Sequence, residues 1–509
     1  MLQLFGVSFS TPQLLAVTFT LWVTYKVASG ISYNAKLRKL GARAPVRRSY
    51  FPLSLDIVYE VVTQSLKDKN YELWLNMFNK YAPGRWTIEA GAGERVILTA
   101  EPENIKAILA TQFKEYGKGP QFHKDWAPFL GDGIFNVDGN LWHNSRQMIR
   151  PQFVKDRLSD LDIFEEHVQI LMKKLGEAPE IDILDMLFKY TLDAATHFLF
   201  GASVDSQLHA QTAFADAFNS VQHIQGIIAR MGPYNWAVPR KRLGYYKSLN
   251  ILDNFIDTYI DKALALSPKE LEEKSNHDED YTFLHSIAAY TRDRKMLRDQ
   301  LVSTLLAGRD TTACTLTWIL YHLSMDHDVL AKLRAEIIET VGLEKAPTYQ
   351  NLKDMKYLQN VMNETLRLYP VVPYNVRVSL QDTTLPTGGG PDGTQPVAIA
   401  KGTPIGYSPL VMQRRADLYP PVESGFPAPD RFVPERWQTW TPKTWQYIPF
   451  NGGPRICIGQ QFALTEMGYT LVRLLQRFET IESMMGGEDP GMRSDIVLQP
   501  SKVVKLAFR

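Results

Sequence analysis

Cysteine is nearly absent from this sequence of 509 residues and occurs only as Cys314 and Cys457. Cys314 lies in the apolar, helix-like run TTACTLTWIL, where a small buried hydrophobic side chain is the simplest interpretation. Cys457 lies in the segment FNGGPRICIG (450–459), which also holds three glycines, a proline and an arginine. One core cysteine and one loop cysteine make a poor disulfide framework, so the sequence indicates a reducing compartment.

The sequence also lacks an excess of charge of either sign. It has 56 Lys and Arg residues against 55 Asp and Glu residues, which gives a formal net charge of +1. No global electrostatic field therefore favours an acidic substrate, and we expect no binding to nucleic acid. With 45% hydrophobic residues, the chain is long enough to bury a large core.

No charged side chain occurs between Leu2 and Tyr25. As a helix these residues would be about 36 Å long, enough to cross a bilayer. Basic residues follow, and no acidic residue precedes Asp56, so the positive-inside rule places the rest of the chain in the cytosol. We therefore predict a membrane anchor over residues 1–29 and a basic linker over 30–50. A cleaved signal peptide is the alternative, although the sequence lacks a basic segment before the apolar run.

Hydrophobic periodicity predicts one large domain, mainly α with a minor β part. Segments on either side of GAG predict a β-hairpin over 85–100, and a helix is expected from Pro102. Apolar residues at helical spacing dominate from about 140 to 370. The longest candidate helix, 295–326, would span about 48 Å. Residues 376–404 have a β-like pattern around the turn cluster TGGGPDG.

The loop around Cys457 is compatible with few thiolate chemistries. A Cys–His hydrolase would need a distant base, because no histidine follows His327, and a zinc site would need further ligands near Cys457. A lone thiolate can instead serve as the axial ligand of a haem iron. Glycines would let the backbone approach the flat macrocycle, and Arg455 could reach a propionate. The helical run after Gly459 would point its N-terminal dipole at the thiolate. An ordinary glycine-rich turn remains the alternative at this point.

The segment FNGGPRICIG resembles the cysteine-ligand loop of the cytochrome P-450 (haem-thiolate) family, F-x-x-G-x-R-x-C-x-G. It matches that pattern at all five fixed positions, which are Phe450, Gly453, Arg455, Cys457 and Gly459. The resemblance implies the cytochrome P-450 fold with a single N-terminal transmembrane helix, and a haem-thiolate catalytic domain over residues 51–509. It also implies haem b (heme b, iron protoporphyrin IX) with Cys457 as the iron ligand. The expected location is the endoplasmic reticulum membrane, with the catalytic domain on the cytosolic side.

The segment AGRDTT (307–312) resembles the oxygen-activation motif in the central helix of that family. The resemblance implies that Thr311 opens a hydrogen-bonding notch beside bound dioxygen and that Asp310 relays protons. Ala307 and Gly308 would leave room over the iron. Family members that link their haem covalently carry glutamate at the position of Ala307, so we expect a haem that is not covalently linked.

Two further helices carry family motifs. Glu364 and Arg367 in NETLRLYP, taken alone, could be a surface ion pair worth about 0.3 kcal/mol. They resemble the E-x-x-R pair of the family, which Arg436 of FVPERW would complete as a structural brace for the cysteine loop. Trp142 and Arg146 resemble the W-x-x-x-R helix that holds the haem propionates.

Arg377 matches another propionate contact. The helix of Trp142 also begins a basic face that we expect to dock an acidic electron donor, formed by Arg146, Arg150, Lys155 and Arg157. The sequence has no complete dinucleotide-binding fingerprint, so electrons must come from a separate protein. The resemblance implies an NADPH–cytochrome P-450 reductase in the same membrane, with cytochrome b5 as a possible second donor.

AGRDTT with its arginine, TLPTGGGPDG and RPQF are most similar to fungal alkane- and fatty-acid-hydroxylating members, which act at the terminal (omega) carbon. The resemblance therefore implies hydroxylation of n-alkanes or long-chain fatty acids. The alternative substrate is a terpenoid, a sterol or another secondary metabolite. Apolar candidates for lining the substrate pocket are Phe122, Phe135, Leu305, Val372 and Pro373. Basic candidates for contacting lipid headgroups or a carboxylate are Arg240, Lys241 and Arg242.

Two other function classes remain open. A peroxygenase or isomerase of this fold would usually lack the acid–alcohol pair Asp310–Thr311. A haem-binding sensor would need no electron donor, so an assay with reductase separates it from a monooxygenase.

Overall fold

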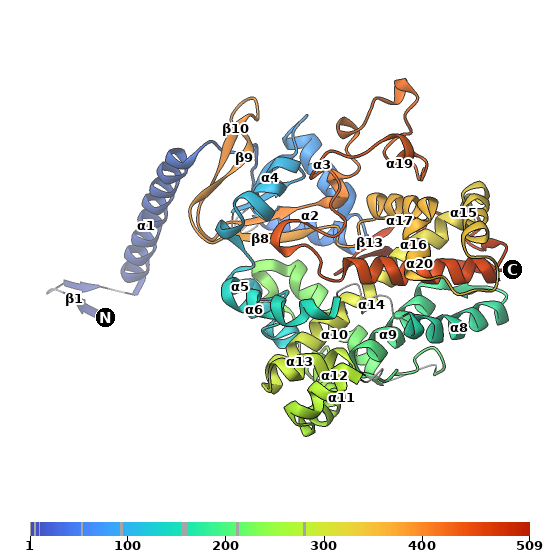
Figure 1. The fold of residues 1–509 in the computed structure, drawn as a ribbon. Coiled ribbons are helices and arrows are strands. Elements are labelled where there is room, and N and C mark those ends of the chain that lie inside the picture. The colour runs from blue at the N-terminus through green and yellow to red at the C-terminus, as the bar shows by residue number, and fades with distance from the viewer. Residues whose placement is uncertain are drawn as a thin grey trace.

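The structure is a computed structural model and describes residues 2–4, 7–9, 11–51, 54–91, 95–153, 161–209, 213–277 and 281–509. Helices dominate the described chain, and a smaller β part lies between them and the N-terminal helix (Figure 1). The expected mainly α fold with a minor β part is confirmed.

The helices are α1 (Thr11–Leu40), α2 (Leu55–Leu66), α3 (Asn70–Tyr81), α4 (Pro102–Lys106), α5 (Gly119–Leu130), α6 (Gly139–Ile149), α8 (Asp162–Glu177), α9 (Ile183–Phe200), α10 (Ala213–Met231), α11 (Tyr245–Ala265), α12 (Pro268–His277), α13 (Phe283–Tyr290), α14 (Arg294–Met325), α15 (His327–Thr340), α16 (Tyr349–Asp354), α17 (Lys356–Leu368), α18 (Pro409–Met412), α19 (Arg436–Thr439) and α20 (Gln460–Arg477). The strands are β1 (Leu2–Leu4), β2 (Val7–Phe9), β3 (Val46–Arg47), β4 (Thr87–Gly91), β5 (Arg95–Thr99), β6 (Tyr116–Gly117), β7 (Ile181–Asp182), β8 (Asn375–Ser379), β9 (Thr383–Gly389), β10 (Gln395–Ile399), β11 (Pro404–Tyr407), β12 (Ile481–Ser483), β13 (Met492–Ser494), β14 (Leu498–Pro500) and β15 (Lys505–Phe508).

Helix α1 differs from the expected anchor at both ends. It starts at Thr11, after a hairpin of β1 and β2, rather than at Leu2. Pro12 explains the late start, because proline is favoured in the first turn of a helix and breaks a helix interior. The expectation of a linker was wrong for residues 30–40, which continue the helix to Leu40. Among the described residues, α1 is the helix long and apolar enough to span a membrane, with a mean hydropathy of 1.4 over its apolar stretch.

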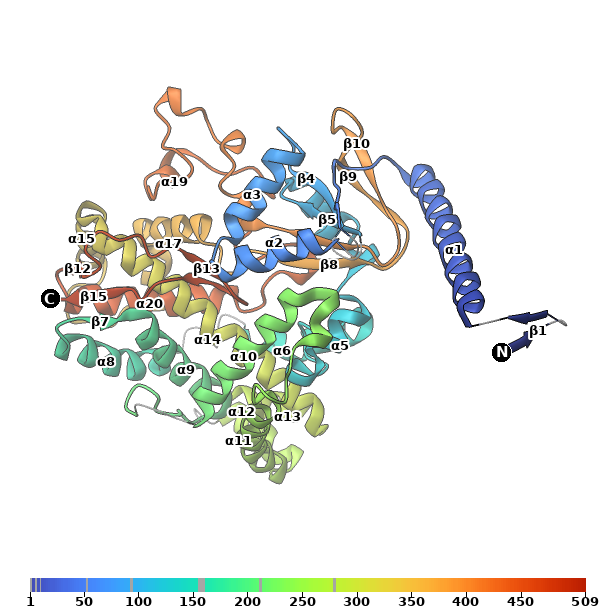
Figure 2. The ribbon, with the colours of Figure 1, turned by 180° about the vertical axis from the view of Figure 1, so that it is seen from behind.

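The C-terminal end of α1 packs against the β part. Leu37 is buried with Ala398 and Ala400 at the end of β10, and Leu40 contacts the same cluster. The Nζ atom of Lys36 lies 2.8 Å from Oδ1 of Asp382. Figure 2 shows α1 meeting the domain at this end only, so the rest of the helix stands clear of the protein.

The main sheet has the strand order β3-β4-β5-β11-β8-β6. Strands β4 and β5 pair antiparallel, which confirms the hairpin expected over 85–100. The segment 376–404 also contains the expected strands, with β9 and β10 forming a second antiparallel hairpin. Strands β8 and β11 join this segment to β5, so residues near 95 and near 405 lie side by side.

Helix α14 runs through the interior and links two hydrophobic cores. Its N-terminal half packs with α5, α10, α11 and α13, through residues such as Leu301 and Leu305. Its C-terminal half packs with α8, α9, α15, α17 and α20, through residues such as Leu316 and Leu320. The segment AGRDTT (307–312) lies between the half of α14 that packs in the first core and the half that packs in the second. The helix expected over 295–326 is confirmed, and Asp293 caps it by accepting from the backbone N–H groups of residues 295 and 296.

Candidate active site

The cysteine loop is held by close backbone contacts. The N–H of Cys457 donates to the carbonyl of Phe450 at 3.0 Å, which closes the loop before α20 begins. Gly453 has a φ of +65°, and a Cβ there would lie 1.9 Å from the carbonyl oxygen of Leu109. A Cβ on Gly452 would lie 2.5 Å from the ring of Trp445. No larger side chain fits at either glycine, so the backbone of the loop contacts Leu109 and Trp445 directly.

The two cysteines have different surroundings. The Cys457 side chain is solvent-accessible, whereas Cys314 is 0% exposed in an apolar cluster. Neighbouring atoms are close enough that burial raises the pKa of the Cys457 thiol, while the N–H of Gly459 and the charge of Arg146 act to lower that pKa. The Cys457 thiol is thus closely surrounded but keeps one open side. A resident group bound by sulfur would fit there.

Helix α14 has a matching accessible face. Thr304, Ala307, Gly308 and Thr311 keep accessible surface in a helix that is otherwise buried from residue 297 to 320 apart from a few positions. The hydroxyl of Thr311 donates to the carbonyl of Ala307 at 2.7 Å. A threonine that bonds back to residue i−4 opens the helix ladder locally. Thr304, Thr315 and Thr317 make the same bond in a helix that is continuous from Arg294 to Met325, so the notch at Thr311 stays a prediction.

Asp310, to which the resemblance assigns proton relay, forms an ion pair with the adjacent Arg309. Its Oδ1 lies 3.0 Å from Nη1 of Arg309, and both side chains are buried. Burial raises the pKa of Asp310, against the opposing effects of Arg309 and a hydrogen bond with Gln222. The Arg309 guanidinium also lies over the ring of Phe188, 4.6 Å from its centroid. The pair Arg309–Asp310 thus faces α9 and α10, beside the face that carries Thr311.

A second buried group holds an excess of positive charge. Arg455 donates to Oδ1 of Asp138 at 2.6 Å and to the carbonyl of Val137 at 2.8 Å. Arg377 and Lys118 both donate to Oδ1 of Asn375, at 2.8 and 3.2 Å. Lys118 is a site residue that sequence reasoning missed.

The pKa shifts in this group are downward, as expected where positive charges outnumber negative ones. Burial and repulsion from Arg377 and Arg455 hold the pKa of Lys118 well below its usual value. Burial and repulsion from Arg377 also lower the pKa of Arg455 to about 10. Its Nε has no hydrogen-bond partner among the residues that the structure describes. Three cations against the single carboxylate of Asp138 fit an anionic ligand such as the propionates of haem.

The comparisons with known proteins agree with this site. The family model of cytochrome P450 matches residues 51–508. The chain belongs to the cytochrome P450 family. It is 47% identical over 510 residues to cytochrome P450 monooxygenase pvhE of Talaromyces variabilis, covering 96% of this chain and 94% of that relative. It is 43% identical over 409 residues to cytochrome P450 52A13 of Debaryomyces hansenii, covering 77% of each chain, and 37% identical over 497 residues to cytochrome P450 52A6 of Candida tropicalis, covering 92% of each.

Membership makes this protein a cytochrome P450 monooxygenase, which uses non-covalently bound haem b with a cysteine thiolate and electrons from redox partner proteins. The chain offers one cysteine with an open side, an accessible face on α14, and a group of two arginines and a lysine with an excess of positive charge. These features fit that cofactor.

The W-x-x-x-R residues of this P450 lie beside the cysteine loop. The ring of Trp142 is flanked by the guanidinium of Arg455, 4.8 Å from the ring centroid, and by the ring of Phe113 at 5.5 Å. Nη1 of Arg146 donates to the carbonyl of Ile456 at 2.9 Å. Arg146 therefore contacts the backbone next to Cys457, a contact that the sequence did not predict.

Glu364, Arg367 and Arg436 form a buried network. The carboxylate of Glu364 accepts from Nε and Nη2 of Arg367 at 2.8 and 2.9 Å and from Nε of Arg436 at 2.9 Å. It also accepts from the N–H of Val433 and from Nε1 of Trp437. All three charged side chains are at most 1% exposed. The interpretation as a surface ion pair is therefore wrong, and the network fixes the chain that precedes the cysteine loop.

The guanidiniums also bond to backbone carbonyls of that chain, Arg367 to Pro429 and Arg436 to Ala428. Burial lowers the pKa of Arg436. Burial acts in the same direction on Arg367, but hydrogen bonding and attraction to Glu364 outweigh it and raise the pKa of that residue.

The five residues expected to line the substrate pocket differ in their solvent exposure. Leu305 is 0% exposed inside the second core, so its assignment to a pocket wall was wrong, because that face of α14 packs on other helices. Phe135 and Val372 are 41% and 38% exposed and keep surface for a ligand. Pro373 is buried, and its carbonyl accepts from the hydroxyl of Ser408. Phe122 is partly buried, with the Nζ atom of Lys118 4.4 Å above its ring.

The expected surface charges are only partly described. Arg150 is exposed, whereas Lys155 and Arg157 lie outside the described residues. Lys241 and Arg242 are exposed, and Arg240 is partly buried. They follow the exposed Trp236 and precede the exposed Leu243 and Tyr246.

Proposed function

We propose that this cytochrome P450 is anchored in a membrane by α1 and hydroxylates the terminal carbon of n-alkanes or long-chain fatty acids. The observation that carries the site assignment is the contrast between the two cysteines. Cys314 is sealed in the core, so Cys457 is the cysteine free to supply the thiolate. When bound, haem b with a thiolate ligand supplies dioxygen activation and C–H hydroxylation.

In this proposal the chain holds and tunes the thiolate. The N–H of Gly459 donates to the sulfur, and the start of α20 and the charge of Arg146 stabilise its anionic form. Arg377, Arg455 and Lys118 hold the propionates, with Trp142 beneath the Arg455 guanidinium. Ala307 offers no carboxylate for a covalent link.

The protons for the reaction pass through α14. The Thr311 hydroxyl donates its proton to the carbonyl of Ala307, so the side chain would have to rotate away from that bond to present the proton on the accessible face. Asp310 must leave its ion pair with Arg309 to pass a proton from the outside, so Arg309 controls when that carboxylate is available. Burial raises the pKa of Asp310, while the charge of Arg309 acts to lower it.

The substrate assignment rests on similarity and on the apolar wall. The relatives named 52A13 and 52A6 align over most of this chain, and the motifs AGRDTT and TLPTGGGPDG resemble hydroxylases of long chains. Phe135 and Val372 offer exposed apolar surface. The second candidate is a terpenoid, sterol or other secondary metabolite, because the identity to pvhE is higher than that to either 52A protein.

The partners follow from the anchor and the basic surfaces. We place α1 in the endoplasmic reticulum membrane with the domain in the cytosol, where NADPH–cytochrome P450 reductase, and cytochrome b5 as a second donor, can reach Arg150. Trp236, Leu243 and Tyr246, with the neighbouring basic residues 240–242, form a surface suited to lipid headgroups and the hydrocarbon below them.

The test is the carbon monoxide difference spectrum of the reduced protein, compared among wild type, Cys457→Ala and Cys314→Ala. We expect the red-shifted Soret band in wild type and in Cys314→Ala, and its loss in Cys457→Ala. A band that survives in Cys457→Ala contradicts the ligand assignment. Spectral titration with dodecane, lauric acid and ergosterol, followed by turnover with reductase, then separates the two substrate classes.

A further inference from the structure

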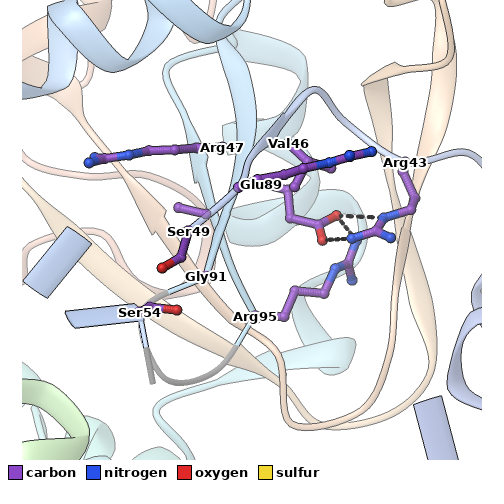
Figure 3. Close-up of a pocket in the computed structure, with 10 residues that line it drawn as sticks. Arg43, Val46, Arg47, Ser49, Ser54, Glu89, Gly91 and Arg95 are labelled. Atoms are coloured by element: carbon purple, nitrogen blue, oxygen red, sulfur yellow. Dashed lines mark hydrogen bonds and ion pairs between the residues drawn. The ribbon is translucent and has the colours of Figure 1, made fainter. Parts of the chain in front are cut away.

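A basic pocket lies where the chain leaves α1, away from the cysteine loop. It is an open depression of about 500 Å³ between β3, β4 and β5. Four arginines line it together with a single acid, Glu89, and two serines; the arginines are Arg43, Arg47, Arg48 and Arg95. Figure 3 shows Arg43 and Arg95 converging on the carboxylate of Glu89.

The carboxylates nearby do not balance these charges. Glu89 is shared by Arg43 and Arg95, and Glu60, outside the pocket wall, pairs with Arg47. The carboxylate of Asp56 accepts from the hydroxyl of Ser49 on the pocket wall. Four arginines thus face three nearby carboxylates, which leaves an excess of one positive charge. Arg48 is exposed on the wall. An anion in the pocket would remove this repulsion.

Donor groups at the pocket are already in place. The Arg95 side chain is 10% exposed, and its Nη2 donates to the carbonyl of Ala398 at 2.9 Å and lies 3.0 Å from Glu89. Its Nε and Nη1 are buried and have no hydrogen-bond partner among the described residues. These two N–H groups lie on different edges of the guanidinium, so each would donate to a separate oxygen atom, and leaving such groups unpaired is costly.

The position of the pocket identifies the source of the anion. Arg43 lies three residues beyond Leu40, the last residue of the membrane-spanning candidate α1. Tyr50 and Phe51, on the same segment as Arg48, are 90% and 62% exposed. Exposed aromatic and basic side chains next to a spanning helix are typical of the headgroup layer.

We propose that this pocket binds the phosphate group of an anionic phospholipid. Arg95 supplies two fixed donors, Arg48 closes over the phosphate from the surface, and Tyr50 and Phe51 contact the lipid below its headgroup. The lipid source rests on the proposed membrane anchorage of α1, whereas the affinity for phosphate rests on the pocket alone. A bound lipid would tie the segment after the anchor to the main sheet.

The experiment measures binding of soluble short-chain lipids to the full-length holoenzyme in detergent micelles. Dihexanoyl phosphatidic acid, dihexanoyl phosphatidylcholine and inorganic phosphate are titrated by calorimetry. We expect phosphatidic acid to bind at least about ten-fold more tightly than the other two, since it combines an anionic phosphate with a lipid tail. Equal affinity for phosphatidylcholine overturns the proposal, and equal affinity for inorganic phosphate overturns the lipid source.

Matched variants separate the pocket from general surface charge. Arg48→Gln should raise the dissociation constant for phosphatidic acid about ten-fold, and Arg95→Gln at least as much. Arg38→Gln removes the same charge from an exposed site on α1 and should change it less than about two-fold. Equal losses in Arg38→Gln and Arg48→Gln refute a specific pocket.

The carbon monoxide band of each sample is the folding control, which matters most for Arg95→Gln because Arg95 also holds Glu89. If the band is intact but phosphatidic acid binds no more tightly than phosphatidylcholine, the pocket proposal is refuted and the proposed function is not. Absence of the band in wild type refutes the proposed function, whatever the lipid result.

Discussion

Replacing Glu364 by glutamine tests how the protein holds its cysteine loop. The carboxylate accepts five hydrogen bonds, of which Oε2 takes those from Arg367 Nε and Trp437 Nε1. In Glu364→Gln the amide group has the same shape but no charge. If its NH₂ replaces Oε2, two buried donors lose their acceptor; if it replaces Oε1, three do.

The size of the effect follows from burial. Arg367 and Arg436 are both at most 1% exposed, so the variant leaves two guanidiniums without their counter-ion in the interior. Removing one partner of a buried ion pair costs about 3–5 kcal/mol, a large share of the net stability of a domain. We expect Glu364→Gln to lower the free energy of unfolding by about that amount and to purify with little haem.

The assay is urea unfolding of the holoenzyme followed by circular dichroism, with the haem-to-protein ratio measured on the same samples. Glu339→Gln, the same change at an exposed site on α15, is the control and should shift stability by less than about 0.5 kcal/mol. A loss below about 1 kcal/mol in Glu364→Gln, with normal haem content, would refute the reasoning that Glu364 neutralises two buried cations.

Three further predictions concern the cysteine loop, α14 and α20. Gly453→Ala should lose haem, since its Cβ would lie 1.9 Å from the Leu109 carbonyl, while Gly176→Ala, with 3.6 Å of clearance, should keep the wild-type haem-to-protein ratio. Thr311→Val should keep the carbon monoxide band but lower product formed per NADPH about ten-fold, measured with reductase; unchanged coupling would contradict a role in proton delivery. Burial raises the pKa of Glu466 to about 8, so its contribution to stability is present at low pH and is lost as pH rises through about 8. Glu466→Gln should therefore match the melting temperature of wild type at pH 5 and exceed it at pH 9, and equal melting temperatures at both pH values would contradict this.

Much of the site could be predicted because its parts are local in sequence. The cysteine loop and the pair Glu364–Arg367 each depend on residues within one loop or one helix. Local backbone geometry then determines which residue types are allowed at each position. At Gly453, for example, the positive φ and the close approach to Leu109 leave no room for a side chain.

The parts that could not be predicted depend on long-range packing. Lys118 joins Arg377 through Asn375, a residue more than 250 positions away. Arg309 pairs with Asp310 although neighbours on a helix do not normally face each other, because Phe188 on α9 holds the guanidinium. Leu305 shows a related limit, since periodicity marks an apolar face of α14 but not whether a cavity or another helix covers it.

The unbroken course of α1 has a mechanical consequence. Thirty helical residues are about 45 Å long, and the hydrocarbon layer takes up about 30 Å, so about 15 Å is shared between the headgroup layers on the two sides, and the part on the domain side is a short stiff stalk ending at Leu40. Because Leu37 and Lys36 fasten that stalk to the protein, tilting the span tilts the whole domain. The helix and the domain would then reorient together as one rigid unit, rather than independently through a flexible linker. In the proposed membrane anchorage, membrane thickness, which sets helix tilt, would decide which side of the domain the proposed electron donor can reach.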